Sequence, residues 1–476
     1  MKNAAAIILA AGLGKRMKSD IPKVLHTVAG RPMPFYPIEV VKDLGIEKVV
    51  IVVGHKGDEV INTLQEVRSQ ESGVRSQNKS QIQFVKQEPQ LGTGHAVLCT
   101  EDSLKDWKDN VLILSGDVPL ITRETIMGLM GLHTKKKAAI SFISTVVADP
   151  SGYGRVIRNK SGSVVRIVED KDAGAREKAV NEINTGIYCI NAPFLFSGLK
   201  NIKKENAQGE YYLPDLIGMA VKEKHKVAAL THIDPAEVMG INNRIELAEA
   251  NRAMRERINN ELMLSGVTML NPESAYIHHG VKIGKDTVIY PNAFLEGSVE
   301  IGERCVIEEG CKIINTIIGN DSVIKSNSVI ESSKIGEKVS IGPFARLRPD
   351  SVVEDEVKIG NFVEVKKSRI GKGTKANHLS YIGDAIIGED VNIGAGTITC
   401  NYDGIKKHQT IIEDGAFIGS DTQLVAPVRV GKNAYIGSGS TITKNVPPGS
   451  LALSRAEQRV VEGWVEKKGL KKRGKK

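Results

Sequence analysis

Aromatic residues are scarce in this chain: Phe, Trp and Tyr together make up 4% of its 476 residues. Long apolar runs are missing as well, because Ala4–Ala11 falls far short of the about 20 residues that a membrane-spanning helix needs. The same run leads into a Gly-rich basic segment instead of a cleavage site, so it predicts a buried first strand and not a signal peptide. These absences favour a cytoplasmic protein with no membrane span and with aliphatic cores.

Cysteine is also rare, with five residues and no Cys-x-x-Cys pair or Cys/His cluster. A zinc site or a disulfide framework is therefore not expected, and a reducing compartment fits.

Positive charge is concentrated at one end. The net charge is +9, but seven basic residues and no acid follow Glu466, which leaves about +2 for the rest of the chain. This predicts a solvated basic tail, with weak contact to an anionic membrane or nucleic acid as the alternative, and no specific nucleic-acid-binding face.

What the chain does have is a repeat. Ile-Gly or Val-Gly occurs 13 times from Gly284 to Gly437, at spacings near multiples of six, and only twice elsewhere. One short strand every six residues, with three strands to a turn, predicts a parallel β-helix with coils of about 18 residues. The aliphatic residue points inward, and Gly lies where a Cβ is costly. Cys305 and Cys311, six residues apart, then fall on neighbouring faces of one coil.

The chain divides into four parts on this basis. Residues 1–243 alternate buried strands such as Lys48–Val53 with helical stretches, which is typical of a layered α/β domain with a mostly parallel sheet. Residues 244–265 predict a connecting helix, 266–455 the repeat domain, and 456–476 the basic tail.

Two polar segments interrupt this pattern. Gln65–Gln83 predicts a surface loop or insertion. The widest gap in the repeat, 25 residues, holds Thr399–Thr410 and predicts an external loop that is a candidate for function.

A Gly-rich turn follows the first strand in the sequence LAAGLGKRM, Leu9–Met17. It is neither a Walker loop nor a Gly-x-Gly-x-x-Gly fingerprint. Gly12 and Gly14 would let backbone N–H groups approach a phosphate, and Arg16 and Lys23 would supply charge. Asp117 follows the buried strand Val111–Leu114, at the edge of the sheet where α/β proteins bind ligands.

Further motifs follow in order: LGTGHA, SGDVPL, GYGR, VEDKD, NTGIY and GINNR, then IGPFARLRP, GNFVEVKKS, GTKANHLSYIGD and GAGTITCNYDG in the repeat. With them the chain resembles, from about residue 4 to about residue 465, the bifunctional bacterial enzymes that make UDP-N-acetylglucosamine. Those enzymes join an N-acetylglucosamine-1-phosphate uridylyltransferase to a glucosamine-1-phosphate N-acetyltransferase. The resemblance implies a Rossmann-like nucleotidyltransferase domain, a connecting helix and a left-handed parallel β-helix of hexapeptide repeats. It also implies Mg²⁺, UTP and acetyl-CoA as cofactor and co-substrates, and a homotrimer.

The resemblance implies residue roles in the first domain. Arg16 and Lys23 would contact the triphosphate, and Asp117 with Asn242 or its neighbour Asn243 would hold Mg²⁺. Uracil and ribose would be held by Leu9, Ala10, Ala11, Gly12, Gln87, Gly92 and Thr93. Ser115 and Gly116 directly precede Asp117 and belong to the same binding site. The sugar would be held by Gly154, Glu169 and Asn184. Ser115 stands where related enzymes often carry Tyr.

In the repeat, His378 is the candidate base, because its ordinary pKa near 6.5 suits removal of a proton from the sugar amine. Its orientation is left open between Asp384 and a backbone carbonyl. Arg348 and Lys366 are 18 residues apart, one coil, and would clamp a sugar phosphate together. The resemblance places the acceptor sugar at Tyr381 and Asn392 and acetyl-CoA at Ala395, Asn401, Tyr402, Ser420, Ser438 and Arg455, where Ser438 replaces a frequent Ala.

Two other interpretations compete. One is a single-activity sugar-1-phosphate nucleotidyltransferase with a purely structural β-helix, and the HLSY motif with Arg348 and Lys366 argues against it. The other is a non-catalytic scaffold like guanine-nucleotide-exchange-factor subunits, which would not need the Gly-rich turn, Lys23 and Asp117 together.

Overall fold

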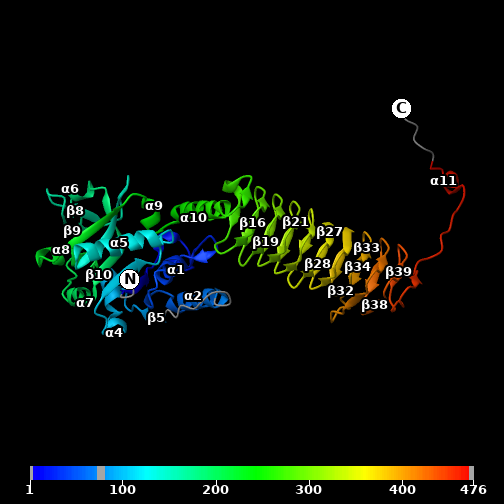
Figure 1. Ribbon diagram of the computed structural model, residues 1–476, viewed down its shortest axis with the longest axis horizontal. Coiled ribbons are helices and arrows are strands. Elements are labelled where there is room, and N and C mark those ends of the chain that lie inside the picture. The colour runs from blue at the N-terminus through cyan, green and yellow to red at the C-terminus, as the bar shows by residue number, and fades with distance from the viewer. Residues whose placement is uncertain (1–3, 72–80, 471–476) are drawn as a thin grey trace, which may run out of the picture. The chain divides into compact units, whose positions relative to one another are not determined.

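The computed structural model describes residues 4–71 and 81–470. They form two compact units, which divide between Arg257 and Ile258. The first unit is built on a nine-stranded sheet with the order β11-β7-β10-β6-β1-β4-β5 (Figure 1). The other two strands branch from this path, because β8 pairs with β10 and β9 pairs with β8. Four of the six pairings along this path are parallel, as predicted, and the antiparallel strand β10 makes the other two. The strands are β1 (Ala4–Ala10), β4 (Lys48–Val53), β5 (Gln81–Lys86), β6 (Asn110–Ser115), β7 (Ile140–Val146), β8 (Arg155–Arg158), β9 (Val164–Val168), β10 (Glu182–Asn191) and β11 (Val227–His232).

Helices cover both faces of this sheet, because its central strands are apolar on both sides. On β1, Ala5 and Ile7 belong to one core, whereas Ala6 and Ile8 belong to the other. The first core includes α3 (Thr93–Leu98), α7 (Ala192–Leu199) and α8 (Asp215–Lys222), and the second includes α1 (Phe35–Asp43), α2 (Gly57–Glu71) and α5 (Arg123–Lys136). The predicted α/β layers are confirmed.

The predicted loop at 65–83 is wrong for every residue of that range that the structure describes. Residues 65–71 continue α2 and residues 81–83 begin β5, while 72–80 lie outside the described residues. Val60 and Leu64 anchor α2 in the core, and the polar residues that follow include good helix formers, so the helix continues beyond its buried part.

The second unit is a left-handed parallel β-helix of short strands, with three parallel sheets of 11, 10 and nine strands (Figure 1). Except for the last pairing of the 11-stranded sheet, a strand pairs with the third strand along the chain, so three strands make one coil. The sheets run from β12 (Thr268–Met269) to β41 (Leu451–Ala452), from β13 (Tyr276–Ile277) to β40 (Thr441–Ile442), and from β14 (Lys282–Ile283) to β38 (Val428–Val430).

Inward-pointing aliphatic residues stack from coil to coil, as predicted. Ile307, Ile324 and Ile341 are fully buried and pair at intervals of 17 residues. A Cβ on Gly319 would lie 2.6 Å from the backbone of Gly336 in the next coil, so close approach explains the repeated glycine.

Helix α10 (Arg244–Leu264) lies where the connecting helix was expected, and the division between the two units falls within it, after Arg257. Arg257 donates to the carbonyl of Leu120 at 3.0 Å in the first unit, and Asn259 donates to the carbonyl of Pro272 at 2.7 Å in the second. Neighbouring residues of α10 therefore hydrogen-bond within different units.

In the C-terminal segment, residues 456–470 are exposed and contain a single helical turn, α11 (Trp464–Lys467), while 471–476 lie outside the described residues. Over residues 4–71 and 81–470, no helix combines the length and apolar character needed to cross a membrane.

Candidate active sites

The first polar cluster lies where β1 and β6 end at the same edge of the sheet. The Gly-rich turn after β1 brings Gly14 against Lys23: a Cβ on Gly14 would lie 2.5 Å from the Lys23 Cβ, and its φ of +62° also favours glycine. The turn opens onto a cavity of about 220 Å³ that is lined by Gly12, Gly14, Arg16, Lys23 and Asn242.

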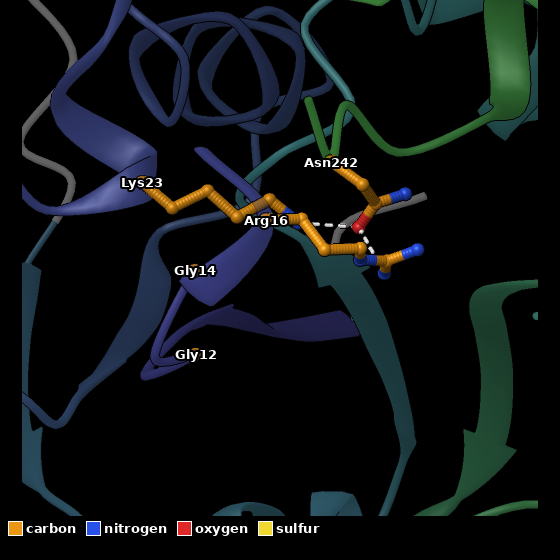
Figure 2. Close-up of a pocket in the computed structure, with 5 residues that line it drawn as sticks. All are labelled: Gly12, Gly14, Arg16, Lys23 and Asn242. Atoms are coloured by element: carbon orange, nitrogen blue, oxygen red, sulfur yellow. Dashed lines mark hydrogen bonds between the residues drawn. The ribbon is translucent and has the colours of Figure 1, made fainter. Parts of the chain in front are cut away.

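Lys23 is the centre of this cluster. Its Nζ donates to the carboxylate of Asp117 and, at 2.8 Å, to Oδ1 of Asn242. Arg16 donates to the same Asn242 oxygen at 2.9 Å, so the two cationic side chains converge on it (Figure 2). The structure thus gathers three predicted residues with Asp117 from distant parts of the sequence.

The side-chain oxygens of Asp117 and Asn242 both accept from the Lys23 ammonium, so they point to one place. Carboxylate and amide oxygens are ligands that suit Mg²⁺. Asn243 turns away, since its Nδ2 donates to Glu246 at 2.5 Å. Within 4–71 and 81–470, no three His, Cys, Asp or Glu side chains group as metal ligands. The donor set therefore fits an ion that keeps waters and substrate oxygens in its shell.

The residues predicted around uracil and ribose line the same edge. Gln87 donates to the carbonyl of Gly92 at 2.9 Å, and Thr93 accepts a hydrogen bond from the Leu213 amide at 3.1 Å. Gly92 has a φ of +98°, and a Cβ there would lie 2.7 Å from the Tyr211 carbonyl. Leu9 and Ala10 end β1, with Ala11 and Gly12 directly after them, and Gly116 donates to the Leu9 carbonyl at 2.9 Å.

The predicted sugar residues also meet. A Cβ on Gly154 would lie 3.1 Å from Oε1 of Glu169, and the Asn184 amide donates to the Gly154 carbonyl at 2.8 Å. Burial raises the pKa of Glu169 to about 7, helped by the neighbouring carboxylates of Asp215 and, more weakly, three other acids. Burial likewise raises the pKa of Asp215 to about 6.

Sequence reasoning missed two residues here. Asp215 begins α8 and its charge acts on Glu169, and Tyr153 hydrogen-bonds Asn242. Tyr153 lies inside the GYGR motif, which was a signal for it, whereas nothing in the sequence connects Asp215 to Glu169. Ser115 ends β6, and its Oγ lies 3.1 Å from where a Gly186 Cβ would stand.

The second cluster follows the register of the β-helix. The residues at one corner occupy equivalent positions in five successive coils, as the pairing of β27 (Lys358–Asn361), β30 (Lys375–His378), β33 (Asn392–Ile393), β36 (Phe417–Ile418) and β39 (Tyr435–Ile436) shows. We call them the corner ladder: Asn361, His378, Ala395, Ser420 and Ser438. The candidate base and three of the residues predicted for acetyl-CoA thus form one continuous row.

Two further predicted residues adjoin the corner ladder. Arg455 donates to the Ser438 carbonyl at 2.7 Å and extends the row beyond the last coil. Asn392 begins β33, three residues before Ala395, and is half-buried.

His378 is exposed at the end of β30, and its Nδ1 lies 2.8 Å from Oδ1 of Asn361. With this oxygen as acceptor, Nδ1 carries the hydrogen and Nε2 keeps a free lone pair. Neither of the two expected partners orients the ring: Asp384 bonds elsewhere, and Asn361 takes the place of a backbone carbonyl. The sequence held a signal, since Asn361 precedes His378 by one 17-residue coil.

Arg348 and Lys366 lie at another corner, one coil apart, as predicted. The Arg348 amide donates to the carbonyl of Val365 at 2.8 Å, which sets the register between β25 (Arg346–Leu347) and β28 (Glu364–Lys366). Each cation has an acidic neighbour: Arg348 donates to Glu364 at 3.0 Å, and Lys366 lies 3.6 Å from Asp384.

The predicted external loop is confirmed, at 401–409 between β34 (Ile398–Cys400) and β35 (Thr410–Ile412). Asn401 at its base donates to Asp384 at 2.5 Å and to the Tyr381 hydroxyl at 3.4 Å. Tyr402 is exposed, and its hydroxyl donates to the Gly404 carbonyl at 2.6 Å.

The same loop supplies a cation that sequence reasoning missed. The Lys407 ammonium contacts that of Lys366, a contact that lowers the pKa of Lys407. Arg348 adds to this effect and the Asp384 carboxylate opposes it, so three cations and one carboxylate interact at this place on the β-helix. Such a group attracts a dianion such as a phosphate.

Comparison with known proteins agrees with this organisation. The family model described as nucleotidyl transferase matches residues 5–235, the GMPPB C-terminal domain matches 271–359, and the bacterial transferase hexapeptide (six repeats) matches 409–444. The bifunctional protein GlmU of Geotalea daltonii is 50% identical over 98% of this chain and 99% of its own length. GlmU of Pelobacter propionicus is 50% identical over 98% of both chains, and GlmU of Clostridium botulinum (strain ATCC 19397 / Type A) is 48% identical over 98% of this chain and 99% of its own.

These matches run through both units and confirm the family resemblance that the motifs indicated. The chain therefore belongs to the GlmU family of bifunctional proteins.

Proposed function

We propose that this chain transfers an acetyl group from acetyl-CoA to glucosamine 1-phosphate in the repeat unit and a uridylyl group from UTP to N-acetylglucosamine 1-phosphate in the first unit. The observation that carries the proposal is the presence of two separate polar clusters, one around Asp117 and one around His378, in a chain that matches bifunctional relatives over 98% of its length. The products would be CoA, UDP-N-acetylglucosamine and pyrophosphate.

In the first unit, a phosphate oxygen of the sugar attacks the α-phosphorus of UTP, and pyrophosphate leaves. No side chain has to form a covalent bond, so the site works by positioning and by neutralising charge. Lys23 and Arg16 face the cavity and contact the triphosphate. Asp117 and Asn242 would hold Mg²⁺, which, when bound, stabilises the charge of the phosphates.

The remaining residues of this site orient the substrates. The backbone from Leu9 to Gly12, together with Gln87, Gly92 and Thr93, holds uracil and ribose. Glu169, with Gly154 and Asn184, accepts hydrogen bonds from the sugar, and Asp215 acts on Glu169 through its charge.

In the repeat unit, the free Nε2 of His378 accepts a proton from the 2-amino group as the nitrogen attacks the thioester carbonyl. Asn361 fixes the tautomer by accepting from Nδ1. Arg348, Lys366 and Lys407 bind the sugar phosphate, and Tyr381 and Asn392 contact the sugar. Acetyl-CoA lies along the corner ladder and Arg455, with Asn401 and Tyr402 beside it.

We further propose that the protein acts as a homotrimer in the cytoplasm, where UTP and acetyl-CoA are made. His378 and the pair Arg348 and Lys366 lie at different corners of the β-helix, so a site that uses both suits a junction between chains. An apolar stripe adjoins His378: Phe344 and Phe362 stack at 5.5 Å, and they and Leu379 are about half exposed. A second copy would cover this stripe.

Purified protein assayed with each substrate pair tests the proposal. CoA release from acetyl-CoA and glucosamine 1-phosphate, and pyrophosphate release from UTP and N-acetylglucosamine 1-phosphate, are both expected, and chelation of Mg²⁺ should stop only the second. Pyrophosphate release without CoA release would instead support the single-activity alternative.

Light scattering and variant mixing test the trimer. His378→Ala and Lys366→Ala chains, each inactive in acetyl transfer, should regain activity when they are mixed and reassembled. A monomeric mass, or no recovery, would contradict a site shared between chains.

A further inference from the structure

The loop at 401–409 interrupts the β-helix, and its ends are tied together by hydrogen bonds. The His408 amide donates to the Asn401 carbonyl at 2.7 Å, and Tyr402 pairs with Lys407 in an antiparallel bridge. The loop is therefore a small hairpin that stands on the coil.

Asp403 organises the tip of this hairpin with both carboxylate oxygens. Its Oδ1 accepts from the Ile405 amide at 2.7 Å and the Lys406 amide at 2.6 Å, and its Oδ2 lies 2.6 Å from Nε2 of His408. These bonds, that of the Lys406 amide first, hold the pKa of Asp403 well below its usual range. Asp403 and His408 thus join the two arms of the hairpin, and we call this pair the clasp.

The clasp fixes the direction of Lys407. Neighbouring side chains of an extended segment point to opposite sides, so a His408 ring turned towards Asp403 leaves Lys407 pointing the other way. The base of the hairpin lies beside Lys366, because Asn401 donates to the Asp384 oxygen that is 3.6 Å from the Lys366 ammonium. There the Lys407 ammonium interacts with that of Lys366. Two ammonium groups in contact repel each other. The Asp384 carboxylate opposes this effect on Lys407, but the repulsion from Lys366 is larger, so the hairpin must be held in place against it.

We propose that Asp403 and His408 are positioning residues that hold Lys407 beside Lys366 and thereby set the affinity of the acetyl-transfer site for the phosphate of its acceptor. This inference rests on the proposed acetyl transfer to glucosamine 1-phosphate. It adds that the affinity for the phosphate depends on the Asp403–His408 contact, which does not itself touch the phosphate. Neither His378 nor acetyl-CoA takes part in this contact.

The main test is the KM for glucosamine 1-phosphate in a His408→Ala variant of the full chain. The KM should rise about tenfold, equivalent to one charge-assisted contact, with the kcat of acetyl transfer within about twofold and uridylyl transfer unchanged. His408→Gln should restore most of the affinity, because its amide can still donate to Asp403. Lys406→Ala removes the same kind of charge from the adjacent position but keeps the backbone amide that donates to Asp403, and it should leave the KM unchanged.

A double-mutant cycle separates positioning from general stabilisation. In a Lys407→Ala background, adding His408→Ala should raise the KM by less than about twofold, because the cation that the clasp positions is already gone. The same tenfold rise with and without Lys407, or a loss of thermal stability and kcat at constant KM, would overturn the inference and leave the proposed function intact. A parent chain that releases no CoA would overturn the proposed function instead, and the inference with it.

Discussion

The two units of this protein build their sites in different ways. In the first unit, Lys23 and Arg16 meet Asn242 across 219 and 226 residues of sequence. In the repeat unit, His378 meets Asn361 across 17 residues. In a solenoid, a distance in sequence is also a distance in space, because each coil adds a fixed number of residues. In a layered α/β unit, the order of strands in the sheet decides which residues meet.

This difference determines how each site is expected to respond to change. In the first unit, β1, β6 and the segment before α10 each supply one part of the cluster, so the whole unit must fold before the site exists. In the repeat unit, the contact between His378 and Asn361 joins one coil to the next. Single substitutions in each unit can show whether the two sites are as separate as this difference implies.

The largest of these effects is expected for Lys23→Ala. This change removes the cation that faces Asp117, Asn242 and the cavity, so uridylyl transfer should fall by about 10²–10³-fold in kcat. Acetyl transfer should be unchanged. Lys178→Ala, which removes an exposed positive charge from the same unit, is the matched control and should leave both rates unaltered. A parallel fall in acetyl transfer would mean that the sites are not independent.

A smaller effect is expected for Asn361→Ala, which removes the Nδ1 partner of His378. Acetyl transfer should slow about tenfold, the equivalent of one hydrogen bond of ~1.4 kcal/mol. The pH–rate profile of Asn361→Asp gives a sharper test. A carboxylate beside the ring stabilises imidazolium, so the acid limb should move to higher pH. An unshifted limb would show that His378 is not the titrating base.

The smallest effect concerns stability in the first unit. The pKa of Glu169 is raised to about 7 in the folded state, so the folded protein keeps a proton that the unfolded chain loses near its ordinary value of 4.5. Stability is therefore lost as the pH rises from about 4.5 to about 7.

Glu169→Gln removes this loss. Above pH 7 the variant should melt a few degrees higher than the parent, and near pH 4 the two should coincide. Glu47→Gln, at an exposed position of the same unit, is the control and should show no such dependence. A difference in melting temperature that is the same at all pH values would contradict a Glu169 pKa that is raised by burial.

The sequence predicted the β-helix well, because each of its coils repeats the same physical requirement. Ile341 and its equivalents point inward, and Gly319 must leave room for the next coil. Asn361 lies one coil before His378, so the same periodicity could have identified it as the partner of the ring. Finding it requires that polar residues, as well as apolar ones, are compared at equivalent positions of successive coils.

Other features were beyond such reasoning. Lys407 belongs to the hairpin that leaves the register, so no spacing indicates its contact with Lys366. Asn242 and Asn243 are the same residue type side by side, and only the helix that begins after them, with Glu246 in its first turn, turns one away. The end of α2 was misjudged because its polar residues have no periodicity, although their helix propensity is high.

The most direct test of two independent sites is a crossed assay of His378→Ala and Asp117→Ala, each folded and each supplied with both substrate pairs. His378→Ala should lose acetyl transfer by about 10²–10⁴-fold and keep uridylyl transfer within about twofold, and Asp117→Ala should do the reverse. Loss of both activities in either folded variant would contradict the account.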